Sequence, residues 1–429
     1  MSATSVARAR AEAMDAVDPL AHLRARFELP VDADGTTQTY LCGNSLGPLP
    51  HAARSAVTRV LDDWSQRAVR GHHDGPRPWL ECHVPFAEPL AALVGAAAAD
   101  VVLMNSLTVN LHLLMISFYR PGPQRCKVLI ERGAFPSDQY AVASQIRLHG
   151  LDPARCLVFA EPRPGEDLLR TEDVEALIAA NGPALALVLL PGVQYRTGQV
   201  LDMGRLTRAA RAAGAAVGWD LAHAVGNVPL ALAEWDADFA VWCSYKYLCG
   251  GPGALAGAYV NARHREAPDL PRLAGWWGHD RDTRFAMGPD FVAMPGAEGW
   301  QLSNPPVLAM APLGAALELY GEAGAERLRT KSLALTAYAL ELLDTRLGDR
   351  VACLTPRAPS ARGAQLSLRV AGDRAAARTA FDRLLERGVI GDWREPDVIR
   401  IAPHPLYNSF TDVWTFVDVL AGILEHHGS

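Results

Sequence analysis

The sequence predicts an α/β protein whose larger part is built around a mainly parallel β-sheet. Short apolar runs rich in valine and leucine alternate with helical patterns through the middle of the chain. These runs are continuously hydrophobic, which is typical of strands covered on both faces by helices. We expect strands at 101–104, 127–131, 185–190, 215–219, 239–243 and 256–260, with covering helices near 109–119, 137–149, 171–181 and 203–213.

The pattern changes after a turn-rich segment at 301–306. Long amphipathic helices over 308–347, short strands near 364–370 and 397–402, and helices around 373–387 and 411–426 indicate a smaller α+β unit. A chain of 429 residues exceeds the size at which one hydrophobic core stops growing, so two domains are expected. We divide the chain into an N-terminal segment at 1–50 that packs with the small domain, a large domain at 51–310 and a small domain at 311–429.

The composition is that of a soluble globular enzyme. A hydrophobic share of 49% and a charged share of 21% lie far from the disordered range. The net charge of -6 leaves no basic stripe for a phosphate backbone, so no nucleic-acid partner is expected. No apolar run approaches a membrane span, and we expect no membrane partner. With no signal-peptide stretch and no paired framework among seven cysteines, the cytoplasm is the expected compartment.

Lysine is scarce in this chain. It occurs three times, at Lys127, Lys246 and Lys331, while arginine supplies almost all of the cationic surface. Unlike arginine, a lysine can lose its proton in a desolvated site and attack a carbonyl carbon. Lys246 follows directly after the expected strand 239–243. Taken alone, it is either a surface lysine or a catalytic amine.

A second reactive group stands at the end of another expected strand. Asp220 follows the strand 215–219, and His223 comes one turn later. Ligands of open α/β sheets bind at the carboxyl ends of strands, so Asp220 and Lys246 are expected to share one crevice. A lysine that forms an imine and an aspartate that keeps a ring nitrogen protonated are the pair that pyridoxal 5′-phosphate requires. On its own, Asp220 could equally be a helix N-cap.

The turn after the strand 101–104 offers a phosphate site. Its sequence runs Asn105-Ser106-Leu107-Thr108 into an expected helix. Backbone N–H groups of Leu107 and Thr108 at a helix start, with the hydroxyls of Ser106 and Thr108, would favour an anion. An ordinary Ser/Thr cap without a ligand explains the turn equally well. No glycine-rich phosphate loop occurs there.

A third turn follows the strand 127–131 and carries Phe135, Ser137 and Asp138. The aromatic face could stack on a cofactor ring, and the two polar side chains could hydrogen-bond to it. Judged alone, the turn is a capped helix start. The histidines at 72, 73 and 83 have no metal-ligand spacing, so no metal site is expected.

Together these segments resemble the kynureninase family, pyridoxal-phosphate enzymes with the aspartate aminotransferase fold (fold type I). The resemblance runs in order through nearly the whole chain. Its most specific strings are SLTVNLHLLM from Ser106, DLAHAVGN from Asp220, WCSYKYL from Trp242 and APHPLYNSF from Ala402. The resemblance implies a seven-stranded sheet in the large domain, pyridoxal 5′-phosphate as cofactor, and a homodimer with composite active sites.

The resemblance also implies a role for each matching residue. Lys246 would bond covalently to the cofactor, and Asp220 would contact the pyridine nitrogen with His223 close by. Tyr245 would touch the phosphate and act as an acid or base. The other expected cofactor contacts are Leu107 and Thr108 at the phosphate, Phe135 on the ring, Ser137 and Asp138 beside it, and Trp276 and Asn304 from the neighbouring subunit.

For the substrate, the resemblance assigns the amino-acid carboxylate to Arg400, whose planar fork suits bidentate binding. Alone, Arg400 could equally be a salt-bridge arginine on a strand. The aromatic ring would lie among Ser45, His72, Ser303 and Asn304. Pro191 departs from some relatives, which carry serine there, so one hydrogen bond to the cofactor is expected to be missing.

The implied reaction is hydrolysis of the Cβ–Cγ bond of L-kynurenine to anthranilate and L-alanine in tryptophan breakdown. The sequence leaves 3-hydroxy-L-kynurenine open as a second substrate, giving 3-hydroxyanthranilate, and leaves open whether the product serves NAD biosynthesis. An aminotransferase or cysteine desulfurase of the same fold is the alternative. A desulfurase needs a reactive small-domain cysteine, and Cys353 has apolar neighbours. The absent glycine fingerprint disfavours a nicotinamide dehydrogenase.

Overall fold

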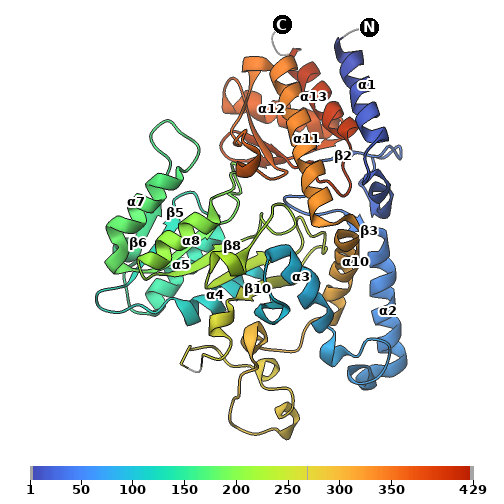
Figure 1. Ribbon diagram of the computed structural model, residues 1–429. Coiled ribbons are helices and arrows are strands. Elements are labelled where there is room, and N and C mark those ends of the chain that lie inside the picture. Colours follow the sequence, from blue (N-terminus) through green and yellow to red (C-terminus); the bar gives the residue numbers. More distant parts are fainter. Residues whose placement is uncertain (1–2, 268, 426–429) are drawn as a thin grey trace.

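The computed structural model describes residues 3–267 and 269–425 (Figure 1). Its larger sheet has seven strands in the order β4, β10, β9, β8, β7, β5, β6. Their bounds are β4 Val101–Met104, β10 Ala256–Val260, β9 Phe239–Cys243, β8 Ala216–Asp220, β7 Leu185–Pro191, β5 Lys127–Glu131 and β6 Leu157–Ala160. Neighbouring strands are parallel except at β10, which is antiparallel to β4 and β9. The mainly parallel seven-stranded sheet is confirmed.

The edge strand β6 is the one strand of this sheet that was not predicted from the sequence. It pairs with β5 from Val128 opposite Leu157 to Glu131 opposite Ala160. Three of its four residues are only partly buried, whereas the other edge strand, β4, is fully buried. The run Leu157–Ala160 is apolar throughout, but it was not assigned as a strand from the sequence.

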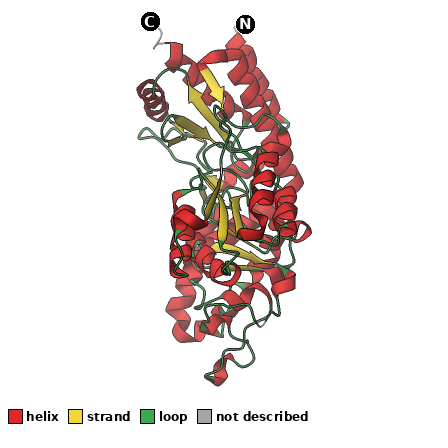
Figure 2. Ribbon diagram, turned by 90° about the vertical axis from the view of Figure 1, so that its left-hand side faces the viewer, coloured by secondary structure: helices red, strands yellow, loops and turns green. Residues whose placement is uncertain are grey.

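Helices cover both faces of the sheet, as Figure 2 shows. Alternate residues of a strand enter different cores: Val101 and Leu103 of β4 pack in one, and Val102 and Met104 in the other. The first core includes side chains of α3 (Ala87–Val94), α7 (Thr171–Asn181), α8 (Met203–Ala212) and α10 (Val307–Ala323). The second includes α4 (Leu107–Phe118) and α5 (Pro136–Leu148). The four helices predicted to cover the sheet are present as α4, α5, α7 and α8.

A second, antiparallel sheet has the strand order β11, β12, β15, β14. Its strands are β11 Val351–Cys353, β12 Leu366–Val370, β15 Val398–Ile401 and β14 Asp392–Arg394. One core joins this sheet to α11 (Ala325–Arg346), α12 (Arg374–Glu386), α13 (Phe410–Glu425) and the N-terminal helix α1 (Ala3–Ala16). The two ends of the chain lie at the same end of the molecule (Figure 1).

Further α-helices and strands complete the structure around the two sheets. The remaining helices and strands are α2 His51–Arg67, α6 Pro153–Cys156, α9 Leu232–Trp235, β1 Phe27–Glu28, β2 Thr39–Tyr40, β3 Leu49–Pro50 and β13 Val389–Ile390. The helix α2 lies beside α10, and β2 pairs in parallel with β13 near the second sheet (Figure 1). α10 contributes to the core of the larger sheet and α11 to the core of the smaller one. The division at residues 50 and 310 stays a prediction.

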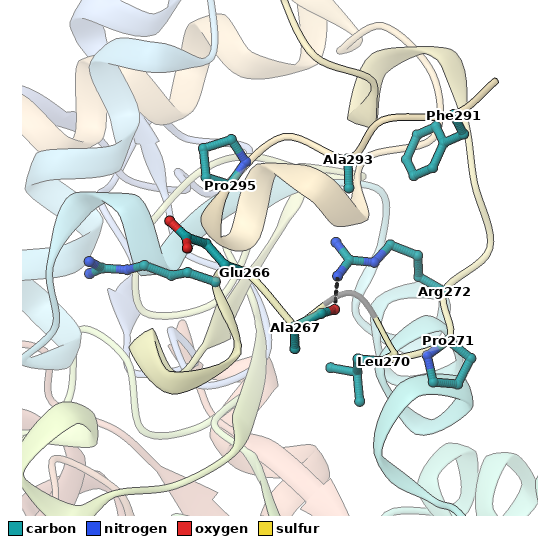
Figure 3. Close-up of a pocket in the computed structure, with 9 residues that line it drawn as sticks. Glu266, Ala267, Leu270, Pro271, Arg272, Phe291, Ala293 and Pro295 are labelled. Carbon is teal, nitrogen blue, oxygen red and sulfur yellow. Dashed lines mark hydrogen bonds between the residues drawn. The ribbon is translucent and has the colours of Figure 1, made fainter.

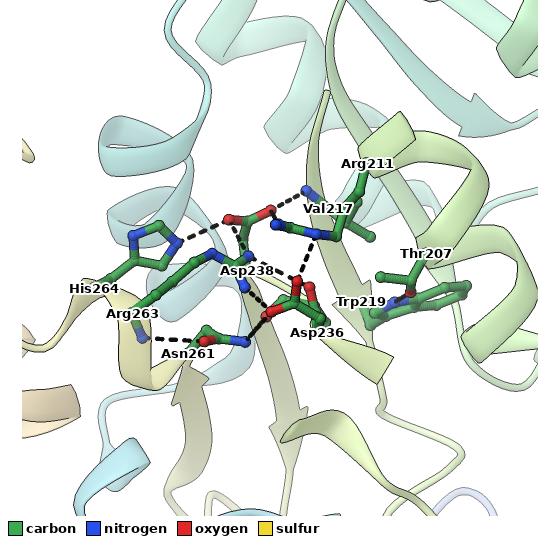
Figure 4. Close-up of polar contacts among 10 residues, drawn as sticks. Thr207, Arg211, Val217, Trp219, Asp236, Asp238, Asn261, Arg263 and His264 are labelled. Carbon is green, nitrogen blue, oxygen red and sulfur yellow. Dashed lines mark hydrogen bonds and ion pairs between the residues drawn. The ribbon is translucent and has the colours of Figure 1, made fainter. Parts of the chain in front are cut away.

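A network of charges fixes the amino ends of β8 and β9 (Figure 4). The buried Asp238 accepts a hydrogen bond from the N–H of Val217 at 2.8 Å and from the Arg263 guanidinium at 2.6 Å. It also lies 2.8 Å from Nε2 of His264. Burial alone would raise the pKa of Asp238, but these donors hold that pKa below its usual value. Both strands are therefore anchored before they reach their carboxyl ends.

Candidate active site

A cavity of about 240 Å³ opens at the carboxyl edge of the larger sheet. Its walls come from the segments that follow β4, β5, β7, β8 and β9. The lining residues are Leu107, Thr108, Glu131, Ala134, Phe135, Ser137, Asp138, Pro191, Val193, Tyr195, Asp220, Ala222, His223, Tyr245 and Lys246. All the residues expected to hold the cofactor are here, except Trp276 and Asn304.

Lys246 and His223 meet inside this cavity. Nζ of Lys246 lies 2.9 Å from Nε2 of His223. Burial first, and then the charge of Lys246, hold the pKa of His223 well below its usual value. The imidazole is therefore neutral, and its Nε2 can accept a hydrogen bond from the lysine. The two groups come from the turns after the adjacent parallel strands β9 and β8.

Two carboxyl groups, of Asp220 and Asp138, face each other in the same cavity. Asp220 ends β8, and its Oδ1 accepts a hydrogen bond from the N–H of Ala222 at 2.7 Å. Asp138 lies in the first turn of α5 and is buried. Burial, and then the neighbouring Asp220, raise the pKa of Asp138 well above its usual value. The raised pKa favours the protonated form of Asp138, which lies beside the carboxyl group expected to serve a ring nitrogen.

The turn expected to bind phosphate forms the start of α4. Ser106 is the N-cap residue, but its hydroxyl makes no capping hydrogen bond. The first N–H groups of a helix have no partner within it, so those of Leu107 and Thr108 remain free for a ligand. A helix dipole directed at the cavity favours an anion there.

Aromatic side chains flank the reactive lysine. The ring of Phe135 is 43% exposed and meets Tyr195 edge to face, with ring centroids 5.3 Å apart. Nζ of Lys246 lies 6.0 Å from the Phe135 ring and 5.8 Å from the Tyr245 ring. Burial raises the pKa of Tyr245, so its phenol keeps its proton. Tyr245 can therefore donate a proton, and Phe135 offers a face for stacking.

Arg400 lies behind the cavity, on β15 of the second sheet, and is fully buried. Its Nη1 donates to the carbonyl oxygen of Tyr195 at 2.5 Å. Its Nη2 donates to Oδ2 of Asp392 at 2.5 Å and to Oγ of Ser45 at 3.2 Å. Two of the residues expected to bind substrate, Arg400 and Ser45, are therefore in contact, and Tyr195 connects them to the cavity wall.

Besides Arg400 and Ser45, four further expected residues do not line the cavity of their own chain. Trp276 is 46% exposed, and Ser303 and Asn304 are exposed as well. His72 meets Trp79 edge to face at 5.2 Å instead. Pro191, by contrast, lines the cavity at the end of β7, where it offers no hydroxyl.

Two cavity residues with polar side-chain groups, Glu131 and Tyr195, were not predicted from the sequence. Glu131 ends β5 as Asp220 ends β8, so the strand-end rule would have found it. Tyr195 lies in an irregular loop, and no local pattern identifies it. Among the described residues, no group of three or more histidine, cysteine or acidic side chains is placed to hold a metal ion.

A larger hollow of about 540 Å³ lies elsewhere and shares no lining residue with the cavity (Figure 3). Arg272 extends between the segments 265–272 and 291–295 and donates to the carbonyl oxygen of Ala267 at 3.4 Å. Its guanidinium stacks 4.0 Å from the Trp300 ring. No residue expected to act in catalysis lines this hollow.

Several buried polar atoms of the cavity have no hydrogen-bond partner, which suits the binding of pyridoxal phosphate. Oε2 of Glu131, Oδ1 of Asp138 and Nδ1 of His223 are buried and make no hydrogen bond with the described residues. Buried polar atoms rarely lack partners, so a polar ligand is expected to supply them. Lys246 would hold such a ring covalently, Asp220 would contact its nitrogen, and the start of α4 would bind its phosphate.

Sequence comparisons identify the family. A model described as kynureninase C-terminal domain matches residues 328–420, and one described as aminotransferase class-V matches residues 155–372. A protein of Xanthomonas campestris pv. campestris (strain B100) named kynureninase is 56% identical over 97% of this chain and 98% of its own length. The kynureninase of Xanthomonas axonopodis pv. citri (strain 306) is 56% identical over 96% of this chain and 97% of its own.

Structural comparisons show the same fold in more distant proteins. The cysteine desulfurase CsdA of Escherichia coli gives a TM-score of 0.75 at 19% identity, covering 96% of this chain and 99% of its own. A variant of C-DES with glycine covalently linked to its PLP cofactor gives 0.73 at 19% identity, covering 90% and 96%. Identities this low show the fold alone, which is fold type I. Fold and relatives together make pyridoxal 5′-phosphate the cofactor, and the chain belongs to the kynureninase family.

Proposed function

We propose that this enzyme hydrolyses the Cβ–Cγ bond of L-kynurenine to anthranilate and L-alanine, a step of tryptophan breakdown. The 3-hydroxy analogue, giving 3-hydroxyanthranilate, is the second substrate that we propose. The observation that carries the proposal is the convergence of Lys246, His223 and Asp220 in one cavity of a chain 56% identical to proteins named kynureninase.

When bound, the cofactor supplies an electron sink beside the α carbon of an amino-acid substrate. Lys246 would remove the α proton with Nζ and later return it. Its position 2.9 Å from the neutral His223 keeps the amine directed into the cavity. Asp220 would keep a proton on the ring nitrogen, while the protonated Asp138 beside it supplies a hydrogen-bond donor rather than a second negative charge.

Tyr245 is the proposed acid for the carbon–carbon cleavage. Because burial raises the pKa of Tyr245, its phenol carries a proton that it can donate to the oxygen on the γ carbon as water adds there. Breaking the bond between the β and γ carbons then releases anthranilate. Tyr245 follows the same strand as Lys246, so one rigid strand end positions both groups.

Arg400 would bind the substrate carboxylate, assisted by Ser45. The guanidinium is held by the carbonyl oxygen of Tyr195 and by Asp392 before any substrate arrives, which fixes its plane. A pre-oriented guanidinium loses little side-chain entropy when it binds a carboxylate.

The direct test is to incubate the purified holoenzyme with L-kynurenine and to measure anthranilate by fluorescence and alanine by chromatography. We expect equal amounts of the two products. Lys246→Ala should abolish turnover and the visible absorption of the bound cofactor. Lys127→Ala is the matched control, because Lys127 donates to Asn181 outside the cavity and should not affect either readout. Sustained turnover by Lys246→Ala would reject the assignment.

The position and the raised pKa of Cys353, the cysteine of the small domain, argue against a cysteine desulfurase activity. Sγ of Cys353 lies 3.7 Å from the carbonyl oxygen of Thr355, and Cys353 does not line the cavity. Burial raises the pKa of Cys353, which disfavours the thiolate that a persulfide carrier needs. Sulfide release from cysteine by the holoenzyme would revive this alternative.

We also propose a homodimer in which Trp276 and Asn304 complete the partner's active site. Large apolar side chains are exposed along one segment: Leu273, Trp276, Phe285, Met287, Phe291 and Val292. Exposed apolar patches of this kind mark association surfaces. His72, Ser303 and Asn304 also lie outside the cavity of their own chain, as residues that serve a neighbouring subunit would.

Mixing two inactive variants tests the composite site. Lys246→Ala and Asn304→Ala subunits, unfolded and refolded together, should form mixed dimers with one intact site. Random pairing would then restore about a quarter of the wild-type activity, because half of the dimers are mixed and each has one of two sites intact. No recovery, together with a monomer in sedimentation, would contradict the dimer.

The cytoplasm is the proposed compartment. All seven cysteines are free, and the sulfurs of Cys126 and Cys156 lie 3.5 Å apart without a bond between them. Adjacent reduced thiols are ordinary in a reducing compartment and unusual in an oxidising one. Among the described residues, no helix is long and apolar enough to cross a membrane. Fractionation of the native cells, with the protein followed by antibody, tests the location.

A further inference from the structure

Glu131 is a buried carboxyl of the cofactor cavity that the proposed reaction leaves unused. It is the last residue of β5, it is 5% exposed, and it lines the cavity. In the sheet, β5 lies two strands from β8, which ends in Asp220. The position of Glu131 is therefore equivalent to that of the aspartate expected to serve the cofactor ring.

The neighbourhood of Glu131 is polar but contains no cation paired with it. Oε1 of Gln194 accepts hydrogen bonds from the N–H groups of Arg196 and Thr197, both at 2.7 Å. That fixes the amide, so Nε2 of Gln194 is the end that donates, at 3.2 Å, to the carbonyl oxygen of Gly133. A Cβ at Gly133 would lie 3.7 Å from Oε1 of Glu131 and 3.8 Å from Nε2 of Gln194. The amide and the carboxyl thus approach the same side of this turn.

One carboxyl oxygen of Glu131 has no partner. Oε2 is buried and makes no hydrogen bond with the described residues, and no ion pair of Glu131 occurs among them. A carboxylate removed from water without a cation is strongly disfavoured. Burial accordingly raises the pKa of Glu131 to about 7, although the Gln194 amide opposes the rise. The titratable groups that share the cavity are Asp138, Tyr195, Asp220, His223, Tyr245 and Lys246.

We propose that Glu131 is a proton-exchanging residue of the cofactor cavity, whose unpartnered oxygen takes up and releases a proton as the charge in the cavity changes. This inference rests on the proposed function, because that reaction produces a proton. Kynurenine and water give alanine and anthranilic acid: the Cβ–Cγ bond and one O–H bond of water break, and a C–O and a C–H bond form. Ionisation of the new acid then releases one proton, which the Glu131 carboxylate can accept and pass to water.

The test compares the pH dependence of the bound cofactor's visible spectrum in three holoenzymes. Glu131→Gln keeps the volume of the side chain and one acceptor oxygen but cannot ionise. Glu161→Gln is the matched control, because Glu161 follows the neighbouring strand β6 and pairs with Arg132 at the surface. We expect wild type and Glu161→Gln to show an inflection at about pH 7, and Glu131→Gln to lack it. The kcat of Glu131→Gln should fall about tenfold or more at high pH, with KM little changed.

Several results would overturn the inference. A wild-type spectrum without an inflection near neutral pH rejects it, as does an unchanged inflection in Glu131→Gln. Lower thermal stability of Glu131→Gln with an unaltered pH titration would show a structural role only. If Glu131→Gln does not fold, Glu131→Asp should retain a shifted inflection, and its loss there rejects the idea. If wild type releases no anthranilate but Glu131→Gln still loses the inflection, the proposed function fails, and only the titration of Glu131 in the cofactor cavity is supported.

Discussion

Arg400 and Asp392 form an ion pair with Nη2 and Oδ2 2.5 Å apart, in which the arginine side chain is fully buried and the carboxylate 10% exposed. The pair joins neighbouring strands of the smaller sheet, where Asp392 stands opposite Arg400 in the register. A guanidinium expected to bind a substrate carboxylate is thus already neutralised by a carboxylate of its own chain.

Arg400→Ala is therefore expected to affect both stability and substrate binding. Removing one partner of a buried ion pair costs about 3–5 kcal/mol. Asp392 keeps its ion pair with Arg394, so we expect a loss of stability in the lower part of that range. Losing a charged hydrogen-bond donor to the substrate costs about 1.5–3 kcal/mol, which is roughly a 10–100-fold rise in KM. Urea unfolding and steady-state kinetics measure the two effects. Arg369→Ala, which breaks half-exposed pairs on the adjacent strand, should leave KM unchanged, and an equal rise there would contradict the assignment.

Asp220 and Asp138 should respond differently to the same substitution. Asp138→Asn replaces a carboxyl whose raised pKa favours its protonated form, so we expect activity within a few-fold of wild type. Asp220→Asn removes the group expected to protonate the cofactor ring, and kcat should fall by about 100-fold or more. Anthranilate release measures both rates. A larger loss in Asp138→Asn than in Asp220→Asn would reverse the proposed roles of the two carboxyls.

Lys331 should matter for stability rather than for catalysis. Its Nζ pairs with Oδ2 of Asp18 at 2.7 Å, and the two side chains are 6% and 4% exposed. Lys331→Met leaves the aspartate buried and unpaired, at a cost of about 3–5 kcal/mol in the free energy of unfolding. The double variant with Asp18→Leu should recover much of that loss. Chemical denaturation measures it, and kcat per folded molecule should remain at the wild-type value.

We predict that the protein loses stability in mild acid because of the buried His404. The histidine is fully buried, stacks on Tyr407 with ring centroids 4.8 Å apart, and has its pKa lowered to about 3 by burial. The unfolded chain binds a proton at this histidine below about pH 6.5, whereas the folded protein does not. Its contribution is therefore complete above pH 6.5 and falls by about 1.4 kcal/mol for each pH unit below that, until about pH 3.

Urea unfolding at several pH values checks this slope. His404→Gln cannot ionise, so its free energy of unfolding should fall less steeply between about pH 6.5 and pH 4. Other buried histidines, His223 among them, add to the slope of the wild-type protein. The contribution of His404 is therefore the difference between the slopes of wild type and variant. Parallel slopes in wild type and variant would reject the role of His404.

The sequence predicts the central part of the fold because those strands are covered on both faces. Six of the seven strands, including the edge strand β4, appear in the sequence as continuous apolar runs. Asp220 and Lys246 could be predicted to share a cavity because each stands at or just after the end of such a strand. The edge strand Leu157–Ala160 is apolar as well, but its residues are less buried and it was not assigned from the sequence. Glu131 also stands at the end of a strand, so its place in the cavity follows from the same rule although no sequence motif identified it.

Other parts of the site depend on contacts between distant segments. Tyr195 lies in a loop whose shape is fixed by the side chain of Gln194, and its carbonyl oxygen reaches Arg400, 205 residues away. Asp392 meets Arg400 through sheet register alone. Local pattern carries no information about either contact. The places of Trp276 and Asn304 depend on a second subunit, and their roles stay predictions.

The anchoring of β8 and β9 through Asp238 has a consequence for redesigning this enzyme. The two strands are spaced by backbone hydrogen bonds, about 4.8 Å apart, and are tied together at the end remote from the cavity. Asp220 and the end of the strand that precedes Lys246 are therefore expected to keep their separation when more distant loops change. We therefore predict that libraries directed at the loops that carry Tyr195, Trp276 or Ser303, two of which are expected to reach the site of a partner subunit, will change substrate preference more readily than they disturb the two strand ends.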